Sequence, residues 1–178
     1  MARGHYSRNR NAAESNRVDA IVSITVKPSG SWQVLLEQGD AKDLYLLGGN
    51  IEIRLDDWLI VLGKFEGALF LFPTLADLLG ACAQLSGLAP RISIDFTGNE
   101  SPLVILRVNN KRPGIVKLIG ARETSPPVSA HQLVKAFGVA IIEFFDSLAV
   151  RIPRERWPED AVEIETKARF FWSRESSY

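Results

Sequence analysis

The stretch from Ser129 to Val150 limits what this chain can fold into more than any other part of the sequence. Pro126 and Pro127 oppose an earlier helical start, because proline biases the residue before it away from helical geometry. Ser129 is a suitable N-cap, and Gln132, three residues later, completes a capping box. The stretch therefore predicts one long helix that begins directly after Ser129.

The predicted helix is apolar over most of its circumference. Its apolar side chains recur with helical period and are Leu133, Val134, Ala136, Phe137, Ala140, Ile141, Phe144, Phe145 and Leu148. A narrow polar stripe remains, formed by Gln132, Lys135, Glu143 and Asp146 with Val139 between them. Such a helix is largely enclosed, so the neighbouring segments must supply a surface for it to cover. Its charged residues also argue against a membrane span.

Segments in which apolar and polar residues alternate occur along the rest of the chain and are typical of strands. They are residues 20–26, 32–36, 44–47, 51–55, 92–96, 103–108, 115–119 and 162–172, and the apolar runs 58–65 and 68–72 suit strands covered on both faces. Gly48, Gly49 and Asn50 predict a tight hairpin. Thr74 predicts the N-cap of a second helix that ends at Ser86, with Asp77 at its third position.

Together these segments predict an α+β fold. We expect a largely antiparallel sheet of about eight or nine strands, covered by one long helix in the C-terminal half, with a shorter second helix nearby. Residues 1–17 are polar and basic and predict a flexible arm, residues 18–172 a single domain, and residues 173–178 a frayed tail. If the predicted C-terminal strand paired with a second chain, the protein would be a homodimer.

The residues suited to catalysis are few. The sequence has one cysteine and two histidines. Cys82 falls on the apolar side of the second helix and is expected to be a buried, inert thiol, while His131 is expected to be exposed. Asp56 and Asp57 are better explained by a turn than by an acid/base pair. We found no HExxH, CxxC, GxSxG or GxGxxG string, so the sequence predicts no catalytic residue, metal or cofactor.

Charge is balanced along the chain, with 21 basic and 21 acidic residues, which favours neither nucleic acid nor a membrane as partner. A lone cysteine and the lack of an apolar leader predict a cytoplasmic location. From residue 37 to 66, however, seven acidic residues oppose three basic ones. This excess predicts either a solvated sheet face or a docking surface for a cationic protein. The candidate partner-binding residues are Asp40, Asp43, Glu52, Asp56 and Asp57.

The order of elements resembles a known family. It runs from Ile51-Glu-Ile-Arg-Leu-Asp-Asp-Trp-Leu-Ile, through the Thr74 helix and the three strands after it, to the long helix. It resembles small bacterial immunity proteins of the WapI type, which neutralise polymorphic toxins delivered between competing cells. The likeness covers roughly residues 32–148. It implies a non-enzymatic, cytosolic protein binder and carries over no functional residue.

Two alternatives stay open at this point. The basic arm could make the chain a subunit of a nucleic-acid-associated or other multiprotein complex. Carboxylates in a cleft between sheet and helix could instead serve an enzyme of unrecognised type.

Overall fold

The computed structural model describes residues 20–29, 47–63, 69–96, 102–108, 114–120 and 123–175. Its strands form two antiparallel sheets of four strands each. The first contains β1 (Val22–Pro28), β2 (Gly48–Leu55) and β3 (Trp58–Leu62), with β4 (Leu69–Phe70) also paired to β2. The second contains β5 (Arg91–Ile94), β6 (Leu103–Arg107), β7 (Ile115–Ile119) and β8 (Val128–Ser129), in that order.

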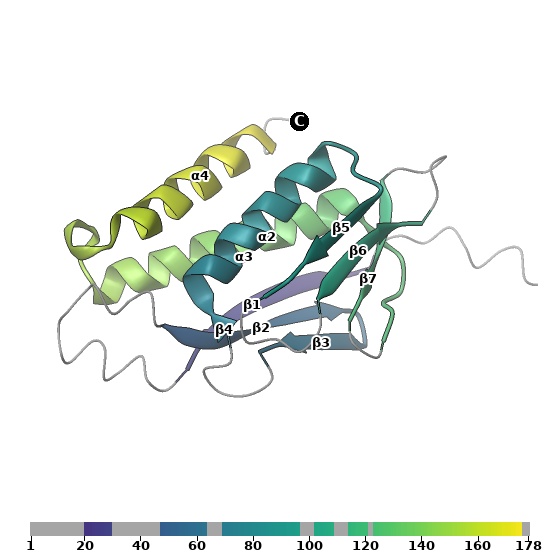
Figure 1. Ribbon diagram of the computed structural model, residues 1–178, viewed down its shortest axis with the longest axis horizontal. Coiled ribbons are helices and arrows are strands. Elements are labelled where there is room, and N and C mark those ends of the chain that lie inside the picture. Colours follow the sequence, from purple (N-terminus) through teal and green to yellow (C-terminus); the bar gives the residue numbers. More distant parts are fainter. Residues whose placement is uncertain are drawn as a thin grey trace, which may run out of the picture.

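Among the described residues, three α-helices complete the fold: α2 (Leu71–Ser86), α3 (Ala130–Arg151) and α4 (Glu159–Glu175). A short 3-10 turn, Arg154–Arg156, joins α3 to α4. Figure 1 shows the first sheet beneath α2 and α3, the second sheet at one end of these helices, and α4 on their outer side. The α+β class and the antiparallel strands are therefore confirmed. The single sheet of eight or nine strands is wrong, because among the described residues β1 to β4 pair only with one another and β5 to β8 pair only with one another.

The long helix forms where the sequence predicts it. Ser129 is the N-cap, and its Oγ accepts a hydrogen bond from the Gln132 backbone N–H at 3.5 Å. The predicted apolar face is buried except at Ala136, which is partly exposed, and Phe137, Phe145 and Leu148 are fully inaccessible. Four aromatic rings pack in T-shaped or tilted pairs, with centroids 5.4 to 6.0 Å apart: Phe72, Phe144, Phe145 and Trp157. Each of these buried side chains contributes about 1.5–3 kcal/mol before its entropy cost.

The helix α2 begins earlier than the sequence predicts. It starts at Leu71, so Thr74 lies in its first turn and donates its hydroxyl to the Phe70 carbonyl at 2.8 Å instead of capping the helix. Pro73 fits there because the first turn does not need its N–H. Asp77 is consequently the seventh helical residue, too far from the helix start to profit from the dipole.

The predicted hairpin at Gly48, Gly49 and Asn50 is also wrong, because these residues begin β2. Gly49 is needed there for close packing. A Cβ on Gly49 would lie 2.5 Å from the Lys27 carbonyl oxygen and 2.9 Å from Leu71 Cδ1. The true turn of this region is Asp56–Asp57, between β2 and β3, where Asp56 has a φ of 50°.

The last predicted strand, residues 162–172, is instead most of helix α4. Alternation of apolar residues predicted a strand, but the buried residues are Ala161, Glu165 and Ala168, at helical spacing. Glu, Lys, Arg and Ala favour helix, and Glu159 and Asp160 lie in the first turn, where negative charge is stabilising. Because this segment is helical, the homodimer proposed through a C-terminal strand has no strand to form it.

Candidate protein-binding groove

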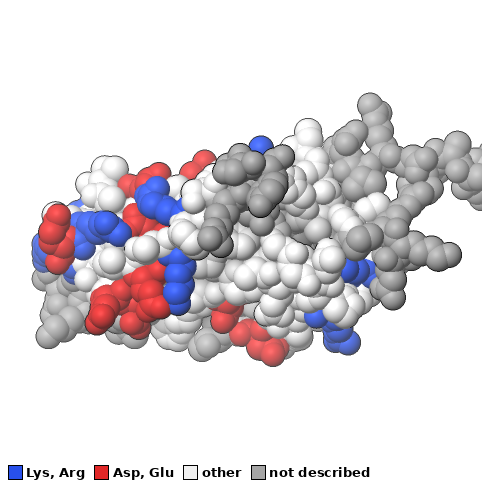
Figure 2. All heavy atoms as spheres, turned by 90° about the horizontal axis from the view of Figure 1, so that it is seen from above, with Lys and Arg blue, Asp and Glu red and all other residues white. Residues whose placement is uncertain are grey.

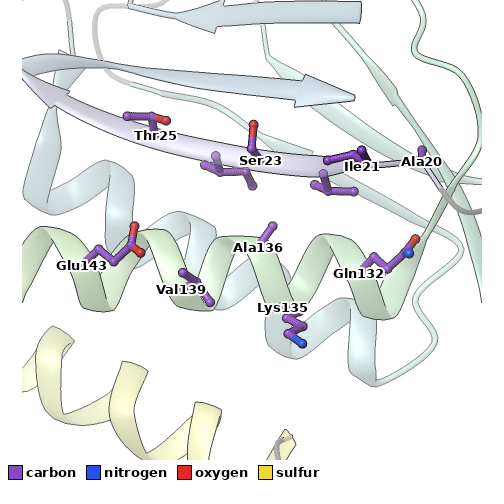
Figure 3. Close-up of a pocket in the computed structure, with 11 residues that line it drawn as sticks. Ala20, Ile21, Ser23, Thr25, Gln132, Lys135, Ala136, Val139 and Glu143 are labelled. Atoms are coloured by element: carbon purple, nitrogen blue, oxygen red, sulfur yellow. The ribbon is translucent and has the colours of Figure 1, made fainter. Parts of the chain in front are cut away.

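An open groove runs between strand β1 and helix α3 and holds about 560 Å³. Figure 3 shows the two elements side by side, with Gln132, Ala136 and Glu143 pointing toward β1 and Lys135 pointing the other way. We call this feature the β1–α3 groove. Its lining residues are Ala20, Ile21, Val22, Ser23, Ile24 and Thr25 on the strand side and Gln132, Lys135, Ala136, Val139 and Glu143 on the helix.

One wall of the groove is the free edge of a sheet. Strand β1 pairs with β2 on one side, and within the described ranges no strand pairs with its other side. The hydrogen bonds at the two ends of the β1–β2 ladder show which residues of β1 direct their backbone N–H and C=O groups toward β2. The Asp56 N–H donates to the Ile21 carbonyl at 3.2 Å, and the Ser29 N–H donates to the Gly48 carbonyl at 2.9 Å.

Because backbone groups alternate in direction along an antiparallel strand, the odd-numbered residues of β1 bond to β2. The N–H and C=O groups of Val22, Ile24 and Val26 therefore point to the free edge. Their side chains point inward, and Ile24 is only 8% exposed. No described residue pairs with these outward donors and acceptors, which lie above an apolar floor.

The other wall is the polar stripe of α3 that the sequence analysis identified. Four of its five members line the groove, and Ala136 joins them at helical spacing. Val139 lies in the middle of this stripe and is 36% exposed, unlike the buried residues on the opposite face of the helix. The fifth member, Asp146, is held by an ion pair with Arg169 of α4.

The polar groups of the groove wall are not paired with one another. Among the residues that the structure describes, neither Lys135 nor Glu143 makes an ion pair. The side-chain oxygen Oε1 of Gln132 is buried and accepts no hydrogen bond from any described residue. A ligand in the groove would therefore meet one cation, one anion and an amide without competing partners.

The acidic residues predicted to bind a partner lie in three places. Asp40 and Asp43 fall outside the described residues. Glu52 lies on the outer face of β2 and pairs with Lys27 at 2.5 Å. Asp56 and Asp57 are exposed at the β2–β3 turn, and Asp56 Oδ1 accepts a hydrogen bond from the Ile21 N–H at 2.9 Å. This bond places the acidic turn at the Ile21 end of the β1–α3 groove.

Charges elsewhere are mixed in sign. Figure 2 shows acidic and basic side chains next to each other at the end of the molecule where α4 lies. Lys167 pairs with Glu163, and Glu165 lies 2.7 Å from Arg154 and 2.9 Å from Arg169. These pairs leave no large surface of one sign on this part of α4.

A second hollow of about 220 Å³ lies at the C-terminal end of α2 and includes Arg107 and His131. His131 is exposed, as predicted. Arg107 is buried and donates from Nε to the Ala89 carbonyl at 2.8 Å and from Nη2 to the Leu85 carbonyl. Its guanidinium thus satisfies carbonyls at a helix end, where positive charge is favourable. In the sequence Arg107 lies within the apolar strand predicted for residues 103–108, and no local pattern there indicates this role.

A scan against protein-family models, and searches of curated proteins and of solved structures, found no match to this chain. In the described parts of the chain, no helix combines the length and apolar character needed to cross a membrane. The same residues contain no group of three His, Cys, Asp or Glu side chains placed to hold a metal ion. Cys82 is buried, as predicted.

Proposed function

We propose that this chain is a non-catalytic protein-binding module that joins a partner chain by strand addition along β1. The observation that carries this proposal is the free edge of β1 beside the exposed stripe of α3. Recognition of this kind draws its affinity from main-chain hydrogen bonds at a sheet edge and its specificity from side-chain contacts beside that edge. The β1–α3 groove offers both.

The dimensions of the groove support an extended segment as its ligand. The six lining residues of the strand side span about 20 Å at roughly 3.4 Å per residue. The helical residues from Gln132 to Glu143 span about 17 Å at 1.5 Å per residue. Both walls therefore match a segment of about five or six residues. Such a segment would bond to Val22 and Ile24 and place alternate side chains against Ala136 and Val139.

The lining of the groove favours binding over chemistry. It consists mainly of aliphatic side chains, two hydroxyls and backbone groups, with Lys135 and Glu143 on different sides of the helix. An acid/base site would need titratable groups that converge on one point. The groove instead spreads its polar groups along a line, which suits an extended chain.

Selection of random 12-residue peptides displayed on phage tests the proposal. Selected peptides are expected to shift the amide resonances of Val22, Ile24 and Val26 and of the α3 stripe in NMR spectra. Val22→Pro removes one outward N–H and leaves the β2 ladder intact, because proline is tolerated on an edge strand whose N–H faces outward. We expect it to weaken peptide binding by about tenfold, equivalent to ~1.4 kcal/mol.

Val22→Ala is the matched control, because it shortens the same side chain and keeps the N–H. It should bind the selected peptides more tightly than Val22→Pro does. Peptides that bind Val22→Pro as tightly as the wild type, or that shift resonances only outside the groove, would refute strand addition.

The toxin-neutralising role implied by the family resemblance is a narrower form of this proposal. It requires a cationic partner, and Asp56 and Asp57 at the Ile21 end of the groove are placed to attract one. With such a partner, Asp56→Asn/Asp57→Asn should slow association and reduce its dependence on salt, because exposed charges act mainly on the association rate. An unchanged association rate would remove the acidic residues from the binding surface.

A further inference from the structure

We infer that the outer face of the second sheet binds an amphipathic helix of another protein, one whose apolar stripe is flanked by acidic residues. The inner face of this sheet packs on the core, where Ile92, Ile105 and Leu118 are at most 3% exposed. The outer face is largely aliphatic as well, although an antiparallel sheet with one face on the core commonly has a polar face toward water. It shares no residue with the lining of the β1–α3 groove, so the inference goes beyond the proposed function.

The pairing of strands β5, β6 and β7 identifies the side chains of this outer face. Residues directly opposite each other in an antiparallel sheet point to the same face, and alternate residues of one strand share a face. Leu106 is 39% exposed and therefore belongs to the outer face. The face consists of three rows of side chains, which are Ser93, Val104 and Ile119, then Arg91, Leu106 and Lys117, and last Val108 and Ile115. Five of these eight side chains are aliphatic.

The outer face of the first sheet provides the contrast. By the same pairing argument its side chains are Ser23, Thr25, Lys27, Asn50, Glu52, Arg54, Leu59 and Val61, which are mostly polar or charged. In the second sheet, Leu106 and Val108 are 39% and 48% exposed and adjoin further aliphatic side chains. Single exposed apolar residues need no explanation, whereas a contiguous group of them marks an interaction surface. This surface lies on the sheet at one end of α2 and α3 (Figure 1).

Two cations flank the aliphatic centre of the face. Arg91 is exposed and Lys117 is partly exposed, and neither makes an ion pair with a described residue. They lie on the strands to either side of Leu106, so their Cα atoms are about 10 Å apart at roughly 4.8 Å per strand. Asp95, two residues beyond Ser93, is exposed and gives one end of the face the opposite sign. The charges therefore favour a partner with carboxylates beside the Leu106 row and none beside Asp95.

An α-helix matches the dimensions of the face. Its diameter of about 10 Å equals the separation of the strands that carry Arg91 and Lys117, so carboxylates on its two sides reach both cations. The aliphatic run from Val104 to Val108 spans about 14 Å, which corresponds to roughly nine helical residues. Helices are also the elements that ordinarily cover the apolar face of a sheet. The partner helix needs apolar residues at i, i+3 or i+4, and i+7, with Asp or Glu on both sides.

The test selects ligands for the full chain from a phage library of helical peptides about 18 residues long, or five turns. The apolar stripe is fixed and the flanking positions are random. Selected peptides should be enriched in Asp and Glu at the flanking positions and should shift the amide resonances of β6 and β7. Arg91→Glu/Lys117→Glu should weaken their binding by about tenfold or more, because like charges then face each other. Peptides with Lys in place of the selected acidic residues should recover this loss on the same variant.

Leu106→Ala tests the apolar centre of the face, and Leu59→Ala is its matched control. Leu59 is 38% exposed on the outer face of the first sheet, against 39% for Leu106. Leu106→Ala should weaken the selected peptides by about tenfold, and Leu59→Ala should leave their affinity unchanged. Thermal melts check that both variants are folded, and the charge-reversal experiment decides the question if Leu106→Ala is not.

Three results would overturn the inference. The first is a selection without acidic enrichment, and the second is a set of peptides that bind the Leu106→Ala and Leu59→Ala variants equally well. The third is a dimer of the wild-type chain that Leu106→Asp dissociates in light scattering, which would assign the face to a second copy. Arg91→Glu/Lys117→Glu should not affect peptides that add to β1, so the proposed function can fail or hold independently of this surface.

Discussion

The two sides of helix α3 differ in how much of their surface is buried. Its inner side meets the first sheet, α2 and α4, and buries Phe137, Phe145 and Leu148 completely. Its outer stripe, centred on Val139, lies beside the edge of β1, and only Asp146, which pairs with Arg169 of α4, makes an ion pair with a described residue. The inner side packs closely against its neighbours, whereas the outer stripe exposes both polar and apolar groups. If the proposed function holds, stability and binding fall to opposite sides of one helix.

The difference between the two sides of α3 is tested most strongly by truncating one residue on each side. Phe137→Ala should lower the free energy of unfolding by about 3–5 kcal/mol, because it opens a cavity in the core. Val139→Ala should change it by less than about 0.5 kcal/mol, since that side chain already meets solvent. Denaturant unfolding of the two variants at low chain concentration measures the difference. Similar losses in both would show that the outer stripe belongs to the core.

Close packing of α3 against α4 should have the next largest effect. A Cβ on Gly138 would lie 2.6 Å from the Trp172 ring, so Gly138→Ala must displace α4 or the ring. We expect a loss of about 1–3 kcal/mol, typical of overpacking. Gly80→Ala is the matched control. A Cβ on Gly80, inside α2, would meet nothing within 4 Å, and the change should stabilise the protein by up to about 1 kcal/mol.

The contact between α4 and the body of the protein would be in doubt if Gly138→Ala proved as stabilising as Gly80→Ala. Fluorescence of Trp172 offers a direct check, because a displaced ring should change its emission even where the melting temperature moves little.

Two carboxylates, the buried Glu165 and the exposed Glu143, test the same difference between buried and exposed groups. Glu165 of α4 is 6% exposed and interacts with two arginines, Arg154 at 2.7 Å and Arg169 at 2.9 Å. Its Oε2 has poor hydrogen-bond geometry toward Arg154, so the contact there is mainly ionic. Glu165→Gln should cost about 1–2 kcal/mol, because the arginines are half exposed and keep part of their hydration.

Glu143→Gln on the outer stripe is the control, and its cost should be close to zero, because Glu143 is exposed and makes no ion pair with a described residue. Thermal melts of both variants at low and high salt measure the contrast. Salt should reduce the effect of Glu165→Gln, and a large effect of Glu143→Gln would mean that this residue has a partner within its own chain.

The sequence was sufficient to predict α3, because the N-cap, the helical period and the apolar face all indicate one helix from Ser129 to Leu148. It also identified the polar stripe, but it could not show what the stripe faces, because the neighbour is β1, more than 100 residues earlier in the chain. The division into two sheets could not be predicted, because alternation of apolar residues identifies a strand but not the strand it pairs with. The start of α2 was predicted too late, because Thr74 resembles an N-cap. The helix α4 was missed because its anchors are small or charged, Ala161, Glu165 and Ala168, and an apolar pattern search ignores them.

The smallest expected effect concerns Asp77, on α2. Partial burial raises the pKa of its carboxyl group above the ordinary value of 3.8, because burial disfavours the charged form. A raised pKa in the folded state means that Asp77 favours folding below its unfolded pKa and that this contribution is lost as the pH rises through the folded pKa. At pH 7, Asp77→Asn should therefore melt slightly higher than the wild type. The advantage should shrink toward zero as the pH falls below about 4, where the carboxyl is neutral in both states.

Asp77→Glu keeps the charge and should keep the wild-type trend, whereas a lower melting temperature of Asp77→Asn at neutral pH would mean that the carboxylate has a stabilising partner.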